Sequence, residues 1–418
     1  SIMAGITTSE VRTNAWSLND YYRQSLQFND KNRRYIGGGE LWMWGRNDVG
    51  QLGQENTTQY SSPVQVPGVW RTVWATGYNT YATKPDGSLW SWGRNHKGQL
   101  GHGDKTDISS PKQVAGSNNW VHVRATRENA MGIRDNGSIW AWGNNTYGQN
   151  LQGAGGLTHD MGANSYSPMP VMGSGYNDYD WSTKPNQVAR QTTGGTWLKN
   201  DGSLWTWGDG QYGALGTGIS TIYYSSPTQI PGDWTGATLA NDGSMQAATK
   251  PDGTLWAWGR NYWGTLGQNQ NQSDMGSSGG YSSAVQIPGT GWYYPVLSSF
   301  SLLCVKGDGT LWGLGANQGN GELGQNSLVN YSSPVQIPGT TWTGAISASY
   351  GSLMAKKSDG TLWGWGRNTN GQLGLNDVVN RSSPTQVPGS DWGENSWAGS
   401  FPSSQGAYAF AFGVIKPG

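Results

Sequence analysis

The 418-residue chain has few side chains able to act in catalysis or to bind a metal. Of its four histidines, only His96 and His102, six residues apart, are close enough in sequence to suggest a shared metal ion. Both fall in a variable turn, so we interpret them as solvent-exposed loop residues. Asp178 and Asp180 form a carboxylate pair of the kind used in acid–base chemistry or calcium binding. No neighbouring base, nucleophile or Asp-rich calcium pattern accompanies them.

The remaining reactive groups also argue against catalysis. The single cysteine, Cys304, excludes an intramolecular disulfide and a Cys-based zinc site. It lies in the apolar run 302–305, which predicts a buried strand thiol rather than a nucleophile. No Gly-x-Ser-x-Gly elbow, His-Glu-x-x-His helix or EF-hand loop occurs. We therefore expect a protein that is not an enzyme and uses neither metal nor cofactor.

Composition narrows the class of protein further. The chain contains 66 Gly and 25 Trp, but only 12% of its residues are charged. Basic and acidic residues number 26 each, so the clustered positive charge that phosphate binding requires is missing. No run of 18 apolar residues occurs. We expect no nucleic-acid partner and no membrane insertion.

A repeated pattern, Leu-Trp-x-Trp-Gly, accounts for 13 of the 25 tryptophans. Its seven copies, two of them variants, start at Leu41, Leu89, Ile139, Leu204, Leu255, Leu311 and Leu362. Asp-Gly or Asn-Gly precedes six copies, which predicts hairpins with two-residue type I′ turns. The acids of these dipeptides are therefore interpreted as turn residues, not as catalysts.

Each copy continues into further motifs that complete a unit of about 50 residues. Gly-x-Asn-x-x-Gly-Gln-Leu-Gly follows, clearest at residues 93–101 and 366–374, and then Ser-Ser-Pro-x-Gln-Val/Ile-Pro-Gly. Short strands with tight turns favour a four-stranded propeller blade. The first copy lacks an upstream strand pair, whereas residues 392–414 supply one, including the alternating stretch 407–412. We therefore expect an all-β, seven-bladed β-propeller over residues 37–418, closed by pairing of the C-terminal strands with the N-terminal blade. Residues 1–36 form a short extension that caps or docks the ring.

These motifs resemble the regulator of chromosome condensation repeat over residues 37–414. The resemblance implies a seven-bladed β-propeller whose blades share strands across the repeat boundary. It does not imply one activity, because function depends on sites carried by the fold. The Trp-, Gly- and Asn-rich form, with Tyr-Ser-Ser-Pro-Val-Gln-Ile-Pro-Gly at residues 331–339, is similar to repeats in structural proteins of marine phages and in bacterial surface proteins.

Candidate binding residues lie where the repeat is interrupted. An insert at about 149–187 combines aromatic, small and acidic side chains, a composition typical of recognition loops. A surface loop packed on its own ring is the alternative. The candidates are Tyr166, Tyr176, Asp178, Tyr179, Asp180 and Trp181 in the insert, together with Tyr262 and Trp263 in a later loop.

The sequence therefore predicts a non-enzymatic propeller that binds other proteins. The expected role is a structural or host-recognition component of a phage virion or bacterial surface, with virion or cell-surface proteins as partners. A lectin-like propeller that binds glycans is one alternative. A cellular interaction propeller that binds an enzyme or small GTPase is another, and it would place the protein in the cytoplasm.

Overall fold

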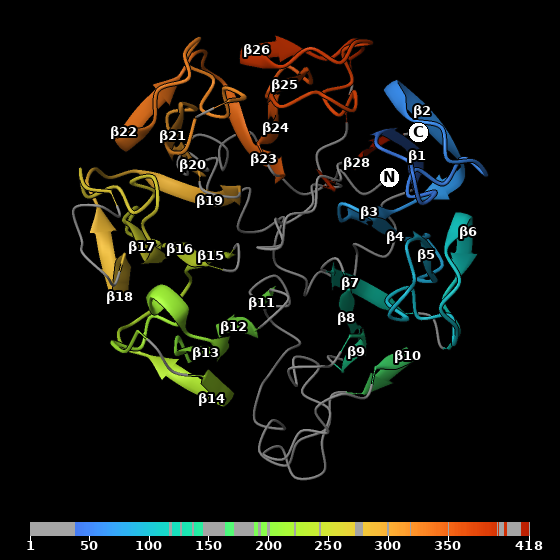
Figure 1. The fold of residues 1–418 in the computed structure, drawn as a ribbon, viewed down its shortest axis with the longest axis horizontal. Helices are drawn as coiled ribbons and strands as arrows, with labels where there is room; N and C mark the ends of the chain where they lie inside the picture. The colour runs from blue at the N-terminus through green and yellow to red at the C-terminus, as the bar shows by residue number, and fades with distance from the viewer. Residues whose placement is uncertain are drawn as a thin grey trace, which may run out of the picture.

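The computed structural model describes residues 38–417 except 117–118, 126–127, 136–137, 145–163, 171–187, 191–193, 199–200, 221–222, 242–243, 272–278, 299–300, 318, 350, 391, 393–396 and 399–410. The predicted extension at 1–36 lies outside this part of the chain. The strands form seven antiparallel four-stranded sheets arranged in a ring (Figure 1). We number these blades in chain order and give their strands from the centre of the ring outwards.

Blade 1 combines both ends of the described chain: β27 (Trp397–Ala398), β28 (Ala411–Pro417), β1 (Gly39–Gly45) and β2 (Tyr60–Trp70). Blade 2 contains β3 (Thr72–Ala75), β4 (Asn79–Thr83), β5 (Leu89–Gly93) and β6 (Ile108–Gln113). Blade 3 contains β7 (Trp120–Ala125), β8 (Asn129–Arg134), β9 (Ile139–Gly143) and β10 (Ser165–Pro170).

Blade 4 contains β11 (Val188–Arg190), β12 (Gly194–Leu198), β13 (Leu204–Asp209) and β14 (Tyr223–Ile230), with the short 3-10 helix η3 (Gln211–Gly213) between the last two strands. Blade 5 contains β15 (Thr238–Asn241), β16 (Met245–Thr249), β17 (Leu255–Arg260) and β18 (Gly280–Ile287). Blade 6 contains β19 (Trp292–Ser298), β20 (Ser301–Lys306), β21 (Leu311–Gly315) and β22 (Tyr331–Ile337). Blade 7 contains β23 (Trp342–Ser349), β24 (Ser352–Lys357), β25 (Leu362–Gly366) and β26 (Arg381–Gln386).

The Leu-Trp-x-Trp-Gly pattern forms the third strand of every blade. In β5, Leu89 and the second tryptophan, Trp92, are buried, whereas the first tryptophan, Trp90, is half-buried. The second tryptophan packs against the preceding blade, as Trp92 does in a cluster with Leu41 and Leu52 of blade 1. The pattern thus forms one strand of each sheet and also provides the tryptophan that packs against the neighbouring sheet.

The ring is closed by strands from opposite ends of the chain. β28 pairs with β1 in continuous antiparallel register from Gly39↔Pro417 to Gly45↔Ala411. The loop of blade 7 also reaches blade 1, because the Asn376 amide donates to the Ser61 carbonyl at 2.9 Å. Closure leaves no open sheet edge between the first and last blades.

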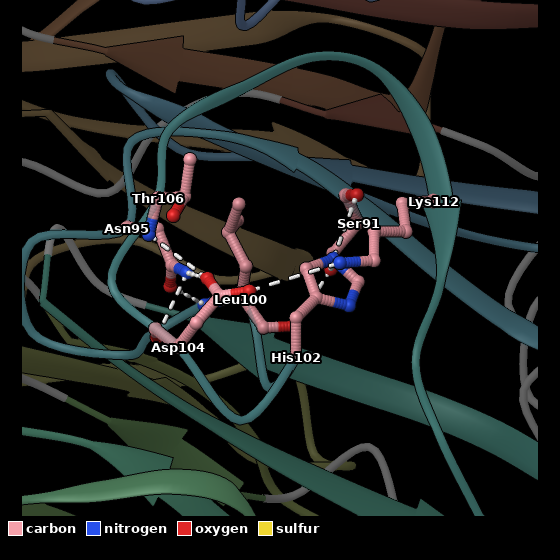
Figure 2. Close-up of polar contacts among 7 residues, drawn as sticks. All are labelled: Ser91, Asn95, Leu100, His102, Asp104, Thr106 and Lys112. Atoms are coloured by element: carbon pink, nitrogen blue, oxygen red, sulfur yellow. Dashed lines mark hydrogen bonds and ion pairs between the residues drawn. The ribbon is translucent and has the colours of Figure 1, made fainter.

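The loop after the third strand contains an asparagine that holds it in shape, which we call the asparagine clasp. In blade 2, Asn95 Oδ1 accepts from the Leu100 amide at 2.8 Å, and Asn95 Nδ2 donates to the Asp104 carbonyl at 3.0 Å (Figure 2). Equivalent clasps are formed by Asn47, Asn261, Asn317 and Asn368.

The fold class expected from the sequence, with seven equivalent blades, is wrong in one respect: the blades do not all carry the asparagine clasp. A complete blade, with four strands and a clasped loop, occurs five times in the described residues, in blades 1, 2, 5, 6 and 7. In blade 4, Gly210 stands at the clasp position and has no side chain to form one. The corresponding loop of blade 3 lies outside the described residues. Within the described residues, the repeat count from the sequence therefore exceeds the number of complete blades, because in blade 4 the strand pattern persists although the loop chemistry changes.

The hairpin turns also differ from the prediction. At Lys84–Ser88, the Gly87 amide donates to the Lys84 carbonyl and the Lys84 amide to the Ser88 carbonyl, both at 3.0 Å. Gly87 has a φ of +79°, whereas Asp86 is not among the residues with positive φ. A three-residue loop with a bulged glycine has this geometry, so the type I′ prediction was wrong.

The acids at these turns are structural, as predicted. Asp86 Oδ1 accepts from the Ser88 amide and hydroxyl at 2.9 and 2.6 Å, and Trp90 Nε1 donates to Ser88 Oγ at 2.9 Å. These hydrogen bonds lower the pKa of Asp86. The same Asp-Ser/Thr-Trp chain of bonds occurs at the turns that begin at Asp201, Asp252, Asp308 and Asp359.

Removal of residues 397–418 should abolish cooperative unfolding of the ring. The deletion takes two of the four strands from blade 1 and exposes the edge of β1. Thermal unfolding followed by circular dichroism should show a lower and broader transition than in the full chain. A melting curve identical to that of the full chain would show that closure contributes nothing to stability.

Candidate functional site

His96 and His102 do not share a metal site. No group of three or more His, Cys, Asp or Glu side chains suited to a metal ion occurs in the part of the chain that the structure describes. His96 Nε2 lies 3.5 Å from Glu128 Oε1 in the loop after β7, whereas His102 contacts Ser91 within its own blade. The two side chains therefore face different partners.

His102 is half-buried rather than solvent-exposed, which corrects the prediction for this residue. Its Nε2 lies 3.0 Å from Ser91 Oγ, and Figure 2 shows the two side chains next to each other. Burial lowers the pKa of His102, so the neutral imidazole is favoured. Glutamines at the corresponding position of other loops join the loop to the outer strand, as Gln54 does with Gln65. His102 has a similar structural role.

Cys304 is confirmed as a buried strand thiol. It lies in β20 and is 1% exposed, with its Sγ donating to the Tyr293 carbonyl at 3.2 Å. Burial raises the pKa of the thiol well above its ordinary value, which disfavours the nucleophilic thiolate.

A set of cationic and aromatic side chains stands out on the ring face that carries the loops after the third strands, which we call the loop face. The Arg260 guanidinium lies 4.5 Å from the Tyr212 ring centroid and 4.6 Å from that of Tyr262. Tyr262 meets Trp263 edge to face, with centroids 4.7 Å apart. We call Tyr212, Arg260, Tyr262 and Trp263 the aromatic ladder. Tyr212 follows β13 of blade 4, Arg260 is the last residue of β17 in blade 5, and Tyr262 and Trp263 follow it, so the aromatic ladder joins blades 4 and 5.

The aromatic ladder has the chemistry of a binding surface. Tyr262 is 39% exposed, and Trp263 and Arg260 are half-buried. Tyrosine, tryptophan and arginine dominate binding energy at protein interfaces because they give large contact areas with few flexible bonds. The stacked arginine is held by its neighbours before any partner arrives, which lowers the entropic cost of binding.

The structure places only some of the predicted site residues. Tyr262 and Trp263 lie together on the loop face. Tyr166, expected in a recognition loop, lies in β10, where its carbonyl accepts from the Gly103 amide of blade 2 at 2.7 Å and its ring lies 4.9 Å from Lys105 Nζ. The remaining candidates, Tyr176, Asp178, Tyr179, Asp180 and Trp181, lie outside the described residues.

Sequence reasoning missed Tyr212 and Arg260. Arg260 directly follows a Leu-Trp-x-Trp-Gly copy, and Tyr212 stands in Gly-Gln-Tyr-Gly, where the asparagine of the loop motif has been lost. Their separation of 48 residues along the chain hides the contact. One signal was available, because equivalent loop positions in consecutive repeats lie next to each other around a ring.

The loop face also contains a buried acid. Glu322 occupies the position held by Gln51, Gln99 and Gln372 in other loops and is 7% exposed. Its Oε1 accepts from Asn320 Nδ2 at 2.9 Å, whereas Oε2 is buried without a hydrogen-bond partner. Burial raises the pKa of Glu322, and the nearby Arg367 opposes this effect only in part.

Replacing Glu322 by Gln should stabilise the protein near neutral pH. A raised pKa in the folded state means that the stability contributed by protonated Glu322 is lost as the pH rises through that value. We expect Glu322→Gln to add about 1–3 kcal/mol to the free energy of unfolding at pH 7, since it removes a buried unpaired charge. Chemical denaturation should show that the difference from wild type shrinks at acidic pH. Gln99→Glu is the matched control and should show the opposite sign.

Comparisons with known proteins agree with the geometry. The family model described as "Regulator of chromosome condensation (RCC1) repeat" matches residues 38–81, 86–131, 201–242 and 359–395, and a second model of the same description matches 120–149 and 345–372. The match at 38–81 begins at β1, the third strand of blade 1, and ends in β4, the second strand of blade 2. RCC1 repeats are therefore found in these parts of the chain, and the repeat at 38–81 contributes strands to two blades.

Solved structures show the same fold. Human WBSCR16 aligns with a TM-score of 0.70 and 19% identity, covering 90% of this chain and 99% of its own. Yeast RCC1 (Prp20), in its complex with Kap60, aligns with a TM-score of 0.72 and 19% identity, covering 92% of each chain. Prp20p of Saccharomyces cerevisiae, described with its binding to Gsp1p and histones, gives 0.72 and 17%, covering 92% of this chain and 94% of its own. The protein thus has the fold of the RCC1-like propellers.

Comparison with the curated proteins finds no match to the sequence. No helix among the described residues has the length and apolar character needed to cross a membrane.

Proposed function

We propose that this protein is a non-enzymatic propeller that binds a protein partner through the aromatic ladder. The proposal depends chiefly on the contact between Arg260, Tyr212 and Tyr262, which joins side chains of two blades into one surface. The four-stranded sheets of the ring support that surface. Similar propellers whose structures describe binding to Kap60, Gsp1p and histones support a protein as the partner.

Within this role, we favour a structural or host-recognition component of a phage virion or bacterial surface. Support comes from the Trp-, Gly- and Asn-rich form of the repeats and from the low charged fraction of 12%. A cellular propeller that binds an enzyme or GTPase is the competing role. Mass spectrometry of purified particles and of cell-surface fractions from the source tests the assignment. Recovery only from cytosolic complexes would exclude the virion or surface role.

The double substitution Tyr262→Thr and Trp263→Asn should abolish partner binding without affecting folding. It gives blade 5 the residues that blade 7 carries at the same loop positions, Thr369 and Asn370, so the loop geometry is already known to accept them. We expect at least a tenfold loss of affinity for the partner recovered from the source, about 1.4 kcal/mol or more. Surface plasmon resonance with the purified partner measures the change.

The matched control is Thr369→Ala with Asn370→Ala in blade 7, which should leave affinity unchanged. Equal affinity of the double substitution and wild type, with both proteins folded, would show that the aromatic ladder is not the binding site.

Carbohydrate binding is a second candidate, favoured by the exposed Tyr262 ring beside Trp263. Aromatic rings stack on the apolar faces of sugars, and the same double substitution would remove that platform. Binding to a glycan array that disappears in this variant supports the lectin role. An array without hits excludes it for the sugars tested.

A further inference from the structure

Two arginines contact one tyrosine ring on the loop face, at the boundary between blades 1 and 2. Arg46 directly follows β1 and Arg94 directly follows β5, whereas Tyr78 lies between β3 and β4. The guanidinium carbon of Arg94 lies 4.4 Å from the centroid of the Tyr78 ring, and that of Arg46 lies 5.7 Å from it. We call these three residues the arginine site. One buried ring thus brings positive charges of two neighbouring blades together.

Arginine also follows the third strand in blades 5 and 7, and comparison of these loops shows how such a residue is normally held. The side chain contacts the residue two positions later in the same loop. Arg46 Nη2 donates to Asp48 Oδ2 at 2.6 Å, and Arg367 Nε donates to Thr369 Oγ1 at 3.0 Å. In blade 5 the corresponding contact is the stacking of the arginine on the aromatic ladder.

Arg94 departs from this arrangement. The residue two positions later is His96, whose Nε2 lies 3.5 Å from Glu128 Oε1 of blade 3. Among the described residues, none contacts the Arg94 guanidinium by a hydrogen bond or an ion pair. The Tyr78 ring therefore holds this cation in place while its N–H donors remain for a ligand. Arg94 is half-buried, so part of the side chain reaches the surface.

The charge of the arginine site favours a carboxylate as this ligand. Two guanidiniums and the Asp48 carboxylate give one net positive charge at neutral pH. One carboxylate neutralises it, whereas a phosphate monoester, with a charge near −2, leaves the site negative. The guanidinium fork also matches a carboxylate in shape, because two parallel N–H donors face its two oxygens.

We propose that the arginine site binds a carboxylate of a protein partner, with Arg94 as the main ligand-binding residue and Arg46 as a second cation. The inference rests on the proposed function only in taking the partner to be a protein. The arginine site lies in blades 1 and 2 and the aromatic ladder in blades 4 and 5, so they are separate contacts on the loop face. Because the arginines reach solvent, binding weakens as the salt concentration rises.

Fluorescence anisotropy on the full chain with labelled peptides tests the proposal. One peptide carries glutamates and an amidated C-terminus, a second carries glutamines and a free C-terminal carboxylate, and a third carries glutamines and an amidated C-terminus. We expect at least one of the first two to bind, and which one binds shows whether the carboxylate is a side chain or a chain end. The third should not bind.

Arg94→Asn should raise the dissociation constant of the bound peptide at least about tenfold. Blade 3 carries Asn144 at the equivalent position, so this loop geometry accepts asparagine. The melting temperature followed by circular dichroism should therefore stay close to wild type. Equal affinity of wild type and the folded Arg94→Asn variant overturns the proposal.

The matched control is Arg367→Asn in blade 7, which removes the same charge from the equivalent position and should leave affinity unchanged. The double substitution Tyr262→Thr and Trp263→Asn should also leave it unchanged, which separates this proposal from the one for the aromatic ladder. Absence of binding by both carboxylate peptides overturns the proposal. Tighter binding of a phosphoserine peptide than of the glutamate peptide overturns the assignment to a carboxylate.

Discussion

The structure depends on one contact repeated around the ring, in which a tryptophan of one blade enters the loop of the blade before it. Trp44, Trp92, Trp142 and Trp365 each donate through Nε1 to the carbonyl of residue 372, 51, 99 or 322 at 2.7–2.9 Å. The indole buries a large apolar area while its single polar group is satisfied. Tryptophan thus provides both the apolar packing between neighbouring blades and a hydrogen bond that fixes the orientation of the indole.

This tryptophan contact imposes a glycine on the receiving loop. A Cβ at Gly53 would lie 2.9 Å from Trp92 Nε1, and one at Gly374 would lie 3.0 Å from Trp44 Nε1. Both glycines also have positive φ, at +69° and +68°, where other residues are strained. The glycines of these receiving loops and the tryptophans that enter them therefore have a common cause, because each of these indoles needs a glycine opposite it. The contact between blade 7 and blade 1 is of the same kind as those within the chain, so closure adds no new type of interaction.

The strand pattern was predictable from sequence because it repeats a local rule. Leu89 and Trp92 are buried and the turn acid Asp86 bonds its neighbours as expected. The number of complete blades was not predictable from this pattern, because the clasp depends on one residue beyond it. Gly210 replaces the asparagine in blade 4 although Leu204 still begins a regular strand. Likewise, Tyr166 was assigned to an insert because spacing alone does not reveal that the outer strand β10 lies within it.

The candidate site was predictable only in part for a related reason. Tyr262 and Trp263 could be identified from the sequence as aromatic residues in a loop. Arg260 and Tyr212 could not be identified as site residues, because only the contact between blades 4 and 5 brings them together. At this boundary the repeated contact is also altered: Trp258 Nε1 has no hydrogen-bond partner, and the Ala214 carbonyl accepts instead from Gln246 Nε2 at 2.7 Å. Departures from a local rule concentrate at functional sites, where selection acts on binding rather than on packing. The aromatic ladder lies at one such departure, which supports the proposal that the ring meets a partner there. The boundary between blades 5 and 6 departs from the rule as well, because Leu314 stands in place of the second tryptophan.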